Sequence, residues 1–503
     1  MDGKYIITYL CCLFAISAAG SEQDTTAIAN HRNEWQKILL STIRDNPSFM
    51  HDTYVTSLTE FGVKGSYRKA DSPLQLETGD GHLLGNLYMQ SYLRLNPNNT
   101  VWGGASYQTG KKHHIRFNST SDYDLLYPYV MADTIGGDIE NERYAFNGGY
   151  ALKIKKLTFG AEMDFRAEHE YRTTDPRPRG IVTDLTLRLG LAYDLKRYKI
   201  GAGLSGRVYK QTNNVEFYNP LGVIPEFHRT GLGTDYVRFA GTIRSAYYKG
   251  TGFMTDFRLA PLTRSGAYCM IEAGYMPYDK ILTELNALPI SRLEIHRCGV
   301  RLGWRCEGDF KWSVSSGWEM EYRRGNEHIA GNSSSTEYKS LITLSMFRNK
   351  RSDIYIDGAL SMGRLLQLTL HAKIGHLDER SEYVHPQREM AFTKHYGSLS
   401  CQFLWRANAQ WLLEWSGQIA YFHNASKRIT MPYAFMDSQR TLLVNHTYRH
   451  KTAHLWKLGA QGSIYHSLKQ WKGIGTFLKA ALYYHRMSFL HQVETEASIG
   501  ITF

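Results

Sequence analysis

The chain contains little proline, and the proline it has is not gathered into linkers. Only 13 of the 503 residues are Pro, and no Pro/Ser-rich stretch separates one segment from the next. A soluble chain of this length usually divides into several domains joined by such linkers. The absence of linkers therefore favours one large domain.

Long apolar runs and internal repeats are also missing. After the N-terminal segment, no run reaches about 18 apolar residues, the length that a membrane-spanning helix needs. The mean hydropathy of −0.40 agrees with this, so a helical membrane protein is excluded. A β-propeller would show a repeat of about 40 residues, and a β-sandwich of this length would need several domains. Neither pattern occurs.

Cysteine is scarce, with six residues in the whole chain, two of them in the N-terminal apolar run. The other four alternate with apolar residues: Cys269, Cys298, Cys306 and Cys401. Cys298 and Cys306 share one face of an extended strand, about 26 Å apart at ~3.3 Å per residue, which is too far for a disulfide. We expect all four to be free cysteines on apolar faces.

Several functional classes lack their usual signals. The net charge is +12, but the basic residues are scattered rather than clustered, so no nucleic acid is expected as a partner. No G-x-S-x-G motif occurs, so we expect no enzyme; the alternative is an outer-membrane hydrolase with a Ser/His or Asp/His pair at its rim. The pairs His113-His114 and His376/His385 are interpreted as solvated loop histidines, and neither a metal nor a cofactor is expected.

Strict alternation of apolar and polar residues is what the sequence does contain. In the last thirteen residues, one parity is apolar or neutral and ends on Phe503, while Glu494 and Glu496 lie on the other. Successive strand side chains point to opposite faces, so this is a two-faced strand. In a soluble sandwich it would be ordinary, but in an outer-membrane barrel it is the closing strand, with Phe503 as the membrane-assembly signal.

The same alternation recurs from about Leu58 onward, and the connections alternate in length. Short ones are expected near Asn98, Lys155, Lys196, Gly250, Gly308, Arg351, Ala407 and Gln470. Long ones are expected near 110–141, 170–180, 212–234, 262–290, 325–336, 379–390 and 425–446. Short turns at one end and long loops at the other are typical of outer-membrane barrels. Eight short turns predict an all-β fold, a single large antiparallel transmembrane β-barrel of about 18 strands, with a range of 14 to 20.

Three segments are harder to assign. The alternation of Val237, Phe239 and Ile243 with Arg238 and Arg244 predicts a strand. Ile354 to Ile374 keeps one parity throughout, which predicts one long strand projecting beyond the membrane, because a two-residue hairpin would flip the parity. Residues 251–290 have room for an additional hairpin.

The N-terminus differs from the rest of the chain. A signal peptide is predicted over residues 1–20, with cleavage near Ala19/Gly20. Its parts are the basic Lys4, an apolar run from Tyr5 to Ile16, and small residues up to Gly20. Trp35, Ile38 and Leu39 then recur at helical spacing. We expect a short helix in a periplasmic or lumen segment over residues 21–53, followed by the outer-membrane barrel over residues 54–503.

The candidates for the lumen or a constriction are charged residues of two kinds. Some lie on the inward parity of the strands, and others lie in a loop from Tyr171 to Arg179 that contains three arginines and two prolines. They are Arg166, Arg172, Asp175, Arg177, Arg179, Arg238, Arg244, Arg297, Arg301, Glu319 and Glu321. Both charge signs are present, so a salt-bridged polar lumen and a constriction that selects anionic or polyhydroxylated solutes both remain open.

The connection between residues 110 and 141 is rich in Asp, Tyr and Gly, which suggests an ordered lumen plug more than an exposed loop. Its plug-loop candidates are Asp122, Tyr127, Tyr129, Asp133 and Asp138. Their carboxylates have no spacing typical of a calcium site, so the expected role is structural.

Three motifs resemble a family of Bacteroidota outer-membrane β-barrels with no assigned biochemical activity. They are Asn46-Pro47, the segment from Tyr127-Pro128-Tyr129-Val130 through Asp133 and Gly136-Gly137-Asp138 to Tyr150, and Tyr171-Arg172 with Asp175-Pro176-Arg177-Pro178-Arg179. The resemblance spans the mature chain. It implies location and architecture, and a component found alongside nutrient-uptake receptors.

Together these observations predict an integral outer-membrane barrel of a Gram-negative bacterium. It is expected to be a channel or nutrient-uptake-associated component for small polar solutes; the alternative is a non-conducting scaffold or partner-binding barrel with an occluded lumen. The expected partners are outer-membrane lipids and lipopolysaccharide, the barrel assembly machinery, and a co-expressed uptake receptor or lipoprotein.

Overall fold

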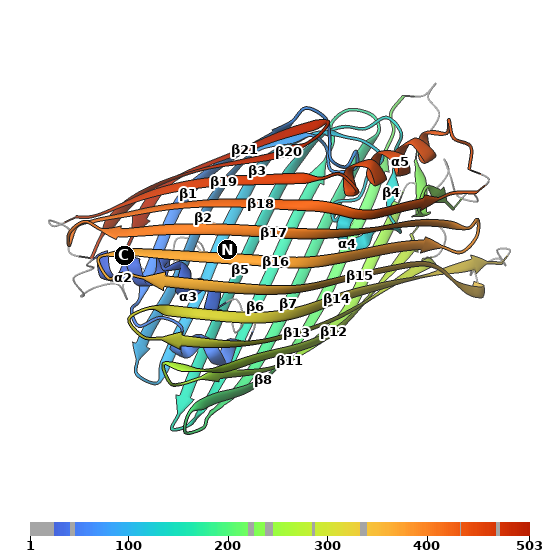
Figure 1. Ribbon diagram of the computed structural model, residues 1–503. Helices are drawn as coiled ribbons and strands as arrows, with labels where there is room; N and C mark the ends of the chain where they lie inside the picture. The colour runs from blue at the N-terminus through green and yellow to red at the C-terminus, as the bar shows by residue number, and fades with distance from the viewer. Residues whose placement is uncertain are drawn as a thin grey trace, which may run out of the picture.

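Eighteen strands form one antiparallel sheet that closes on itself in the computed structural model of this chain (Figure 1). The structure describes residues 25–40, 46–219, 226–236, 245–283, 287–331, 340–432, 434–468 and 473–503. The barrel closes where β1 (Leu58–Ala70) pairs with β21 (Leu490–Thr502), from Glu60 opposite Thr502 to Ala70 opposite Gln492. The prediction of a single antiparallel barrel of about 18 strands is confirmed.

The remaining barrel strands follow the chain in order. They are β2 (Gly81–Asn96), β3 (Asn99–Ile115), β5 (Gly137–Ile154), β6 (Leu157–Tyr171), β7 (Arg177–Asp194), β8 (Tyr198–Glu216), β11 (Ser245–Pro261), β12 (Ser265–Leu282), β13 (Leu288–Glu307), β14 (Lys311–Ala330), β15 (Ser340–Met362), β16 (Leu366–Tyr383), β17 (Arg388–Arg406), β18 (Trp411–Thr430), β19 (Leu455–Ser467) and β20 (Gly475–Met487). A separate three-stranded sheet joins β10 (Thr234–Asp235), β9 (Phe227–Gly231) and β4 (Met131–Ala132). The helices are α2 (Thr25–Arg32), α3 (Glu34–Leu40), the 3-10 helix η1 (Pro47–Asp52), α4 (Tyr123–Leu126) and α5 (Gln439–Lys451).

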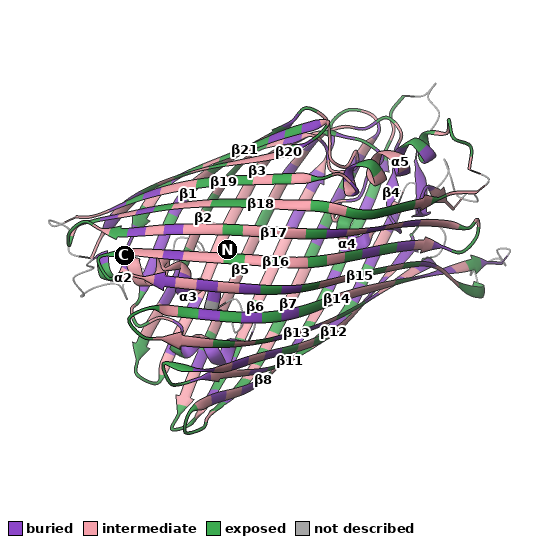
Figure 2. Cartoon of the chain, viewed as in Figure 1, coloured by how far each residue is buried: buried purple, intermediate pink, exposed green. Residues whose placement is uncertain are grey.

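Burial alternates along the strands, as Figure 2 shows. In β21, Ile499 is 64% exposed and Ile501 38%, whereas Thr502 between β20 and β1 is buried. Glu496 faces the lumen, where it pairs with Lys64 of β1 at 3.0 Å. Large apolar side chains exposed around a closed barrel need an apolar solvent, and a closed barrel is the form in which strands cross a lipid bilayer. The chain is therefore a transmembrane β-barrel.

No helix in the described part of the chain combines the length and apolar character required to cross a membrane.

Eight short connections join successive strands at one end of the barrel, in agreement with the predicted number; the one predicted near Gln470 lies partly outside the described residues, and two others were misplaced. Gly250 and Arg351 lie inside β11 and β15, and the turns are at residues 262–264 and 363–365. The predicted long connection at 262–290 is wrong for the same reason, since β12 occupies most of it. The β11–β12 hairpin takes the place of the turn predicted near Gly250, so the additional hairpin considered for residues 251–290 does not increase the number of strands.

The prediction of one long strand from Ile354 to Ile374 is also wrong. Residues Leu360 and Leu370 face each other across the β15–β16 hairpin, so partners have the same parity and the apolar face continues unchanged through the turn. An odd number of residues between paired positions produces this result, and constant parity therefore does not exclude a hairpin. The strand predicted around Arg238 and Arg244 lies outside the described residues.

All four described cysteines are free, as their shared faces predicted. The predicted N-terminal helix is present, although it is divided into α2 and α3 around Asn33, and η1 follows. Asn46 caps η1 by accepting a hydrogen bond from the backbone N–H of Ser48. The predicted signal peptide over residues 1–20 lies outside the described part of the chain.

Replacing Phe503 with Asp should impair assembly in the membrane. Phe503 extends the closing seam, because its N–H and carbonyl both bond Thr59 of β1 at 2.9 and 2.7 Å. A charge at the membrane interface costs only up to about 1 kcal/mol, so a large loss would come from recognition during assembly. Heat-modifiable mobility of membrane fractions measures the folded fraction. Phe435→Asp, at a loop residue that is 85% exposed, is the matched control and should assemble normally; equal assembly of both variants would contradict the role of Phe503.

Candidate functional site

The N-terminal segment is inserted into the lumen at the end with the short turns (Figure 1). Its 3-10 helix η1 lies against β5, β6 and β7, at inward positions occupied by glycine. A Cβ at Gly160 would come within 2.3 Å of the Pro47 carbonyl carbon, and one at Gly201 within 2.4 Å of the Phe49 ring. The barrel wall is therefore shaped to accept this segment.

Polar contacts fix the same segment from several sides. Asn46 donates to Asp256 of β11 at 3.0 Å, and Lys199 of β8 pairs with Asp52 at 2.8 Å. On the opposite wall, Arg32 of α2 forms an ion pair with Glu60 of β1. Ion pairs held inside a barrel are screened less than surface pairs, so they anchor the segment to both sides of the lumen.

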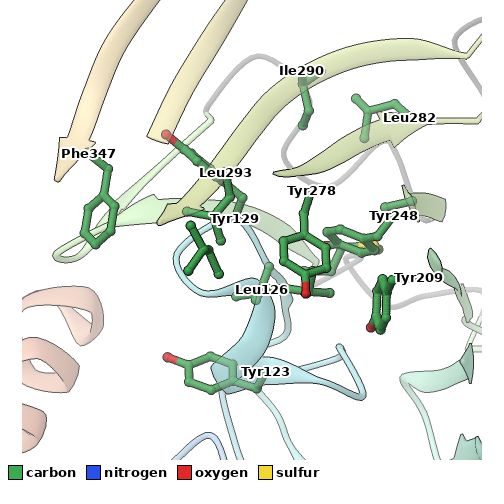
Figure 3. Packing of buried hydrophobic residues seen from close by; sticks show 14 of the residues in the cluster. Tyr123, Leu126, Tyr129, Tyr209, Tyr248, Tyr278, Leu282, Ile290, Leu293 and Phe347 are labelled. Atoms are coloured by element: carbon green, nitrogen blue, oxygen red, sulfur yellow. The ribbon is translucent and has the colours of Figure 1, made fainter. Parts of the chain in front are cut away.

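At the other end, the connection between β3 and β5, residues 116–136, packs into the lumen; we call it the plug loop. Its β4 pairs with β9 from the connection between β8 and β11. Its Tyr123, Leu126 and Tyr129 belong to a buried cluster together with inward side chains of β8 to β17. Figure 3 shows this packing around Tyr209, Tyr248, Tyr278, Leu282, Ile290, Leu293 and Phe347. The plug loop is thus part of the barrel interior.

A buried group of charges holds the plug loop in place. The guanidinium of Arg172 lies 3.2 Å from the carboxylate of Asp133, and both side chains are almost completely buried. Ser119 donates to Asp133 at 3.1 Å and also contacts Glu226 at 3.2 Å. Burial, together with the nearby charge of Asp133, raises the pKa of Glu226 well above its usual range. Removing one partner of such a group leaves the other charge buried and unpaired, which is costly.

The plug loop also contacts opposite walls of the barrel. The two terminal guanidinium nitrogens of Arg166 in β6 donate to the carboxylate of Asp122, at 2.6 and 2.9 Å. Burial of Asp122 is outweighed by these bonds and by the charge of Arg166, so its pKa is lowered. Across the lumen, Arg323 of β14 donates to the carbonyl oxygen of Asp124 at 2.7 Å, and Lys280 of β12 donates to that of Val130 at 3.0 Å.

A polar chamber of about 640 Å³ lies between the two inserted segments. It shares Gln90 and Asn147 with the cavity beside the N-terminal helices, and Arg166 at its wall pairs with the plug loop. Its charged lining residues are Lys64, Arg143, Arg166, Arg188, Asp164 and Asp184. Four cations against two carboxylates give this lining a positive balance.

The structure gathers only part of the predicted candidates in the lumen. Arg297, Glu321 and Glu319 are inward: Arg297 pairs with Glu321 at 2.7 Å, and Glu319 accepts from Tyr355 at 3.0 Å. Arg301 is also inward and pairs with Asp357 at 2.7 Å.

The Arg/Pro loop is shorter than predicted, and several of its charged residues do not face the lumen. The connection covers only residues 172–176, because β6 extends to Tyr171 and β7 begins at Arg177. Arg177 lies beside Asp175 and Tyr218, and Arg179 bonds His169, on the outward parity of β7. Of this group only Arg172 reaches the interior. Arg238 and Arg244 lie outside the described residues.

Among the plug-loop candidates, Asp138 lies at the half-exposed start of β5, where it pairs with His113 at 3.0 Å. Tyr129 reaches Glu327 of β14 at 3.4 Å, and Tyr127 offers its carbonyl oxygen to Arg323. Within the described ranges, no three His, Cys, Asp or Glu side chains are placed to hold a metal ion.

Sequence reasoning missed Glu77 and Arg229, which connect three segments at the loop end. Arg229 of β9 pairs with Glu77 of the β1–β2 connection at 2.6 Å, and also donates to the Tyr123 hydroxyl at 2.9 Å. Both side chains are buried. Neither residue lies in an alternating strand of the barrel, so periodicity contained no signal for this contact.

Asp133→Asn should loosen the plug loop, because it removes the carboxylate that pairs with the buried Arg172, and loss of one partner of a buried pair costs about 3–5 kcal/mol. Hydrogen exchange of residues 116–136 in the folded barrel should increase strongly. Asp138→Asn, at a half-exposed pair, is the matched control and should exchange like the parent. Equal protection of the two variants would show that the buried pair does not hold the loop.

Comparison with known proteins shows what this chain is similar to. No curated protein matches the sequence significantly. Among solved structures, the ferric-catecholate import receptor Fiu from E. coli K12 has a TM-score of 0.36 at 7% identity, covering 88% of this chain and 81% of that one. The outer membrane transporter YddB from Escherichia coli has a TM-score of 0.37 at 8% identity, covering 88% and 80%. CdiB from Acinetobacter baumannii has a TM-score of 0.35 at 10% identity, covering 88% and 60%.

Similarities this distant carry no argument about function. A family model, in contrast, matches residues 47–503, which is most of the chain and includes every strand of the barrel. This chain belongs to the family of unknown function DUF6850.

Proposed function

We propose that this chain is an outer-membrane barrel that takes part in solute uptake and whose lumen is closed at rest. The observation that carries the proposal is the occupied lumen. Barrels of 16 to 18 strands are wide enough to leave an aqueous channel, and here segments from the N-terminus and from the plug loop fill both ends. A polar chamber remains between them.

The chamber supports small polar solutes as the transported class. Its lining carries Lys64, Arg143 and two further arginines, against Asp164 and Asp184. Charged rings of one sign favour permeants of the opposite sign, so the positive balance favours anionic or polyhydroxylated solutes. Within the described part of the chain, Arg143 has no hydrogen-bonded or ion-paired partner, so its charge is available to a solute.

The shape of the barrel and the signal peptide expected from the sequence support an outer-membrane location. Short turns at one end, an even number of strands and an apolar outer belt are features of Gram-negative outer-membrane barrels. A signal peptide cleaved near Ala19/Gly20 would deliver the chain there, and the motif resemblance supports a Bacteroidota origin. We expect the barrel assembly machinery and a co-expressed uptake receptor or lipoprotein as partners.

A second candidate is a non-conducting scaffold with the same location. It is favoured by the extent of the packing at the loop end, where the plug loop, β9 and α5 share a buried cluster of Phe117, Ala132, Phe227 and Leu443. Both proposals share the closed resting state. They differ in whether the chamber becomes continuous with water once the inserted segments are displaced.

Conductance in planar bilayers tests both proposals. The intact barrel should show little steady conductance, and so should variants that lose only residues 25–52 or have only residues 119–132 replaced by a Gly/Ser linker. The variant with both changes should conduct, because the lumen of an 18-stranded barrel is then unobstructed. Steady large conductance of the intact barrel would contradict the closed resting state. Absence of conductance in the double variant would favour the non-conducting scaffold.

Ion selectivity of that open double variant tests the chamber. Arg143→Glu should move its reversal potential in a salt gradient toward cation selectivity, because the charge lining the chamber changes by two units. Lys249→Glu, at an exposed position of β11 outside the lumen, is the matched control and should leave the reversal potential unchanged. The same potential for both variants would remove the chamber from the conduction path.

A further inference from the structure

Four histidines form a row on the outer surface of the barrel, across β16, β17, β18 and the start of β19. They take no part in the lumen packing or in the function proposed above. His376 of β16 lies opposite His395 of β17, with their Nδ1 atoms 3.2 Å apart. His395 lies opposite His423 of β18. The ring centroids of His423 and His454, the residue before β19, are 4.8 Å apart. All four are exposed.

Basic residues continue this row on the next strands around the barrel. Arg486 of β20 lies opposite His491 of β21, and both side chains are exposed on the outward parity. On β1, Lys69 is the exposed outward residue at the same level, opposite Val493. Seven side chains that are positively charged or can be protonated therefore lie next to one another around the outer surface. We call them the basic row.

The basic row lies at the upper edge of the apolar belt, toward the loop end. In β16 the outward Leu366 and Ile374 precede His376, and the charged Asp378 and Arg380 follow it. Trp456 follows His454 in the chain, on the belt side of the row, and its ring centroid lies 4.4 Å from that of Tyr421 with the two rings tilted. Aromatic side chains at the end of an apolar belt mark the membrane–water interface. The row is thus at the depth of the lipid head groups.

Metal binding does not account for the row, since within the described ranges no three His, Cys, Asp or Glu side chains converge on one point. The rings instead lie side by side along the surface. Two imidazoles 3.2 Å apart repel each other when both are protonated, and an anion placed against the row would remove that repulsion. Phosphate oxygens accept several such hydrogen bonds at once.

We propose that the basic row binds the phosphate groups of the outer-leaflet glycolipid, lipopolysaccharide. The row is continuous with the lipid-facing belt, and its positive charge is complementary to a phosphate. Both features favour a lipid head group as the occupant. The proposal rests on the outer-membrane location proposed above, but not on conduction. Phosphate contact would order the glycolipid on the face of the barrel formed by β16 to β21 and β1.

Histidine is the side chain whose charge changes within the physiological pH range, so the contact should depend on pH. The groups that face the row from the same and neighbouring strands include both signs. They are Asp378, Arg380, Glu389 and Arg428 on the loop side, and Tyr421 and Tyr484 within the row, the latter bonding His491 at 2.6 Å. Acidification adds positive charge only at the histidines and should strengthen phosphate binding.

The test is binding of purified full-length barrel in detergent to lipid A with its phosphates and to the same lipid after phosphate removal. Native mass spectrometry counts the bound lipid at about pH 6 and about pH 8. The intact barrel should prefer the phosphorylated lipid by about fivefold or more, and more strongly at the lower pH. A variant with His376, His395, His423 and His454 all changed to Gln should lose most of the preference and most of its pH dependence, because only Lys69, Arg486 and His491 of the row remain.

Two controls make the outcome decisive. His296→Gln changes another outward histidine, which has Tyr275 and Tyr322 rather than histidines beside it, and should bind like the parent. Changing the four row histidines to Lys should restore the preference at both pH values, which a merely structural role would not do. Equal binding of the two lipids by the intact barrel, or parental binding by the four-Gln variant, overturns the proposal. Fractionation of the protein to another membrane would instead contradict the proposed location.

Discussion

The hydrogen-bonded seam between β1 and β21 is the constraint on which the rest of the structure depends. No water is available in the hydrocarbon core to satisfy backbone N–H and C=O groups, so every strand must pair on both sides. With eighteen strands this closure produces an interior too wide for the wall's own side chains to fill. The inserted N-terminal segment and the plug loop fill part of that interior, and a polar chamber lies between them.

Ion pairs, together with apolar packing, hold the loops in place inside the barrel. Arg172 with Asp133, Arg229 with Glu77 and Arg166 with Asp122 each join a loop to the wall or to another loop. Apolar contacts alone would favour burial without selecting one arrangement, whereas paired charges are costly to separate. A plug fixed in this way stays closed until several pairs are broken together, which agrees with a lumen closed at rest.

The sequence predicted the barrel well and the lumen only partly, for a physical reason. Alternation identifies a strand such as β21 because lipid on one side and water on the other impose opposite chemistry on adjacent residues. The same rule misplaced Arg351 as a turn, since an odd-length hairpin keeps the parity from Leu360 to Leu370. Contacts among loops follow no period, so the Arg229–Glu77 pair could not be found by periodicity.

The outer surface shows what alternation can reveal once the register is known. His376, His395, His423 and His454 are far apart in the sequence, and each alone is an ordinary outward histidine. Pairing of β16 with β17 and of β17 with β18 aligns three of them at one depth, and ring stacking adds the fourth. Lipid-facing positions are normally apolar, and a polar group there is tolerated only where head groups begin. Four histidines in register are therefore the observation on which the proposed contact with lipid head groups rests.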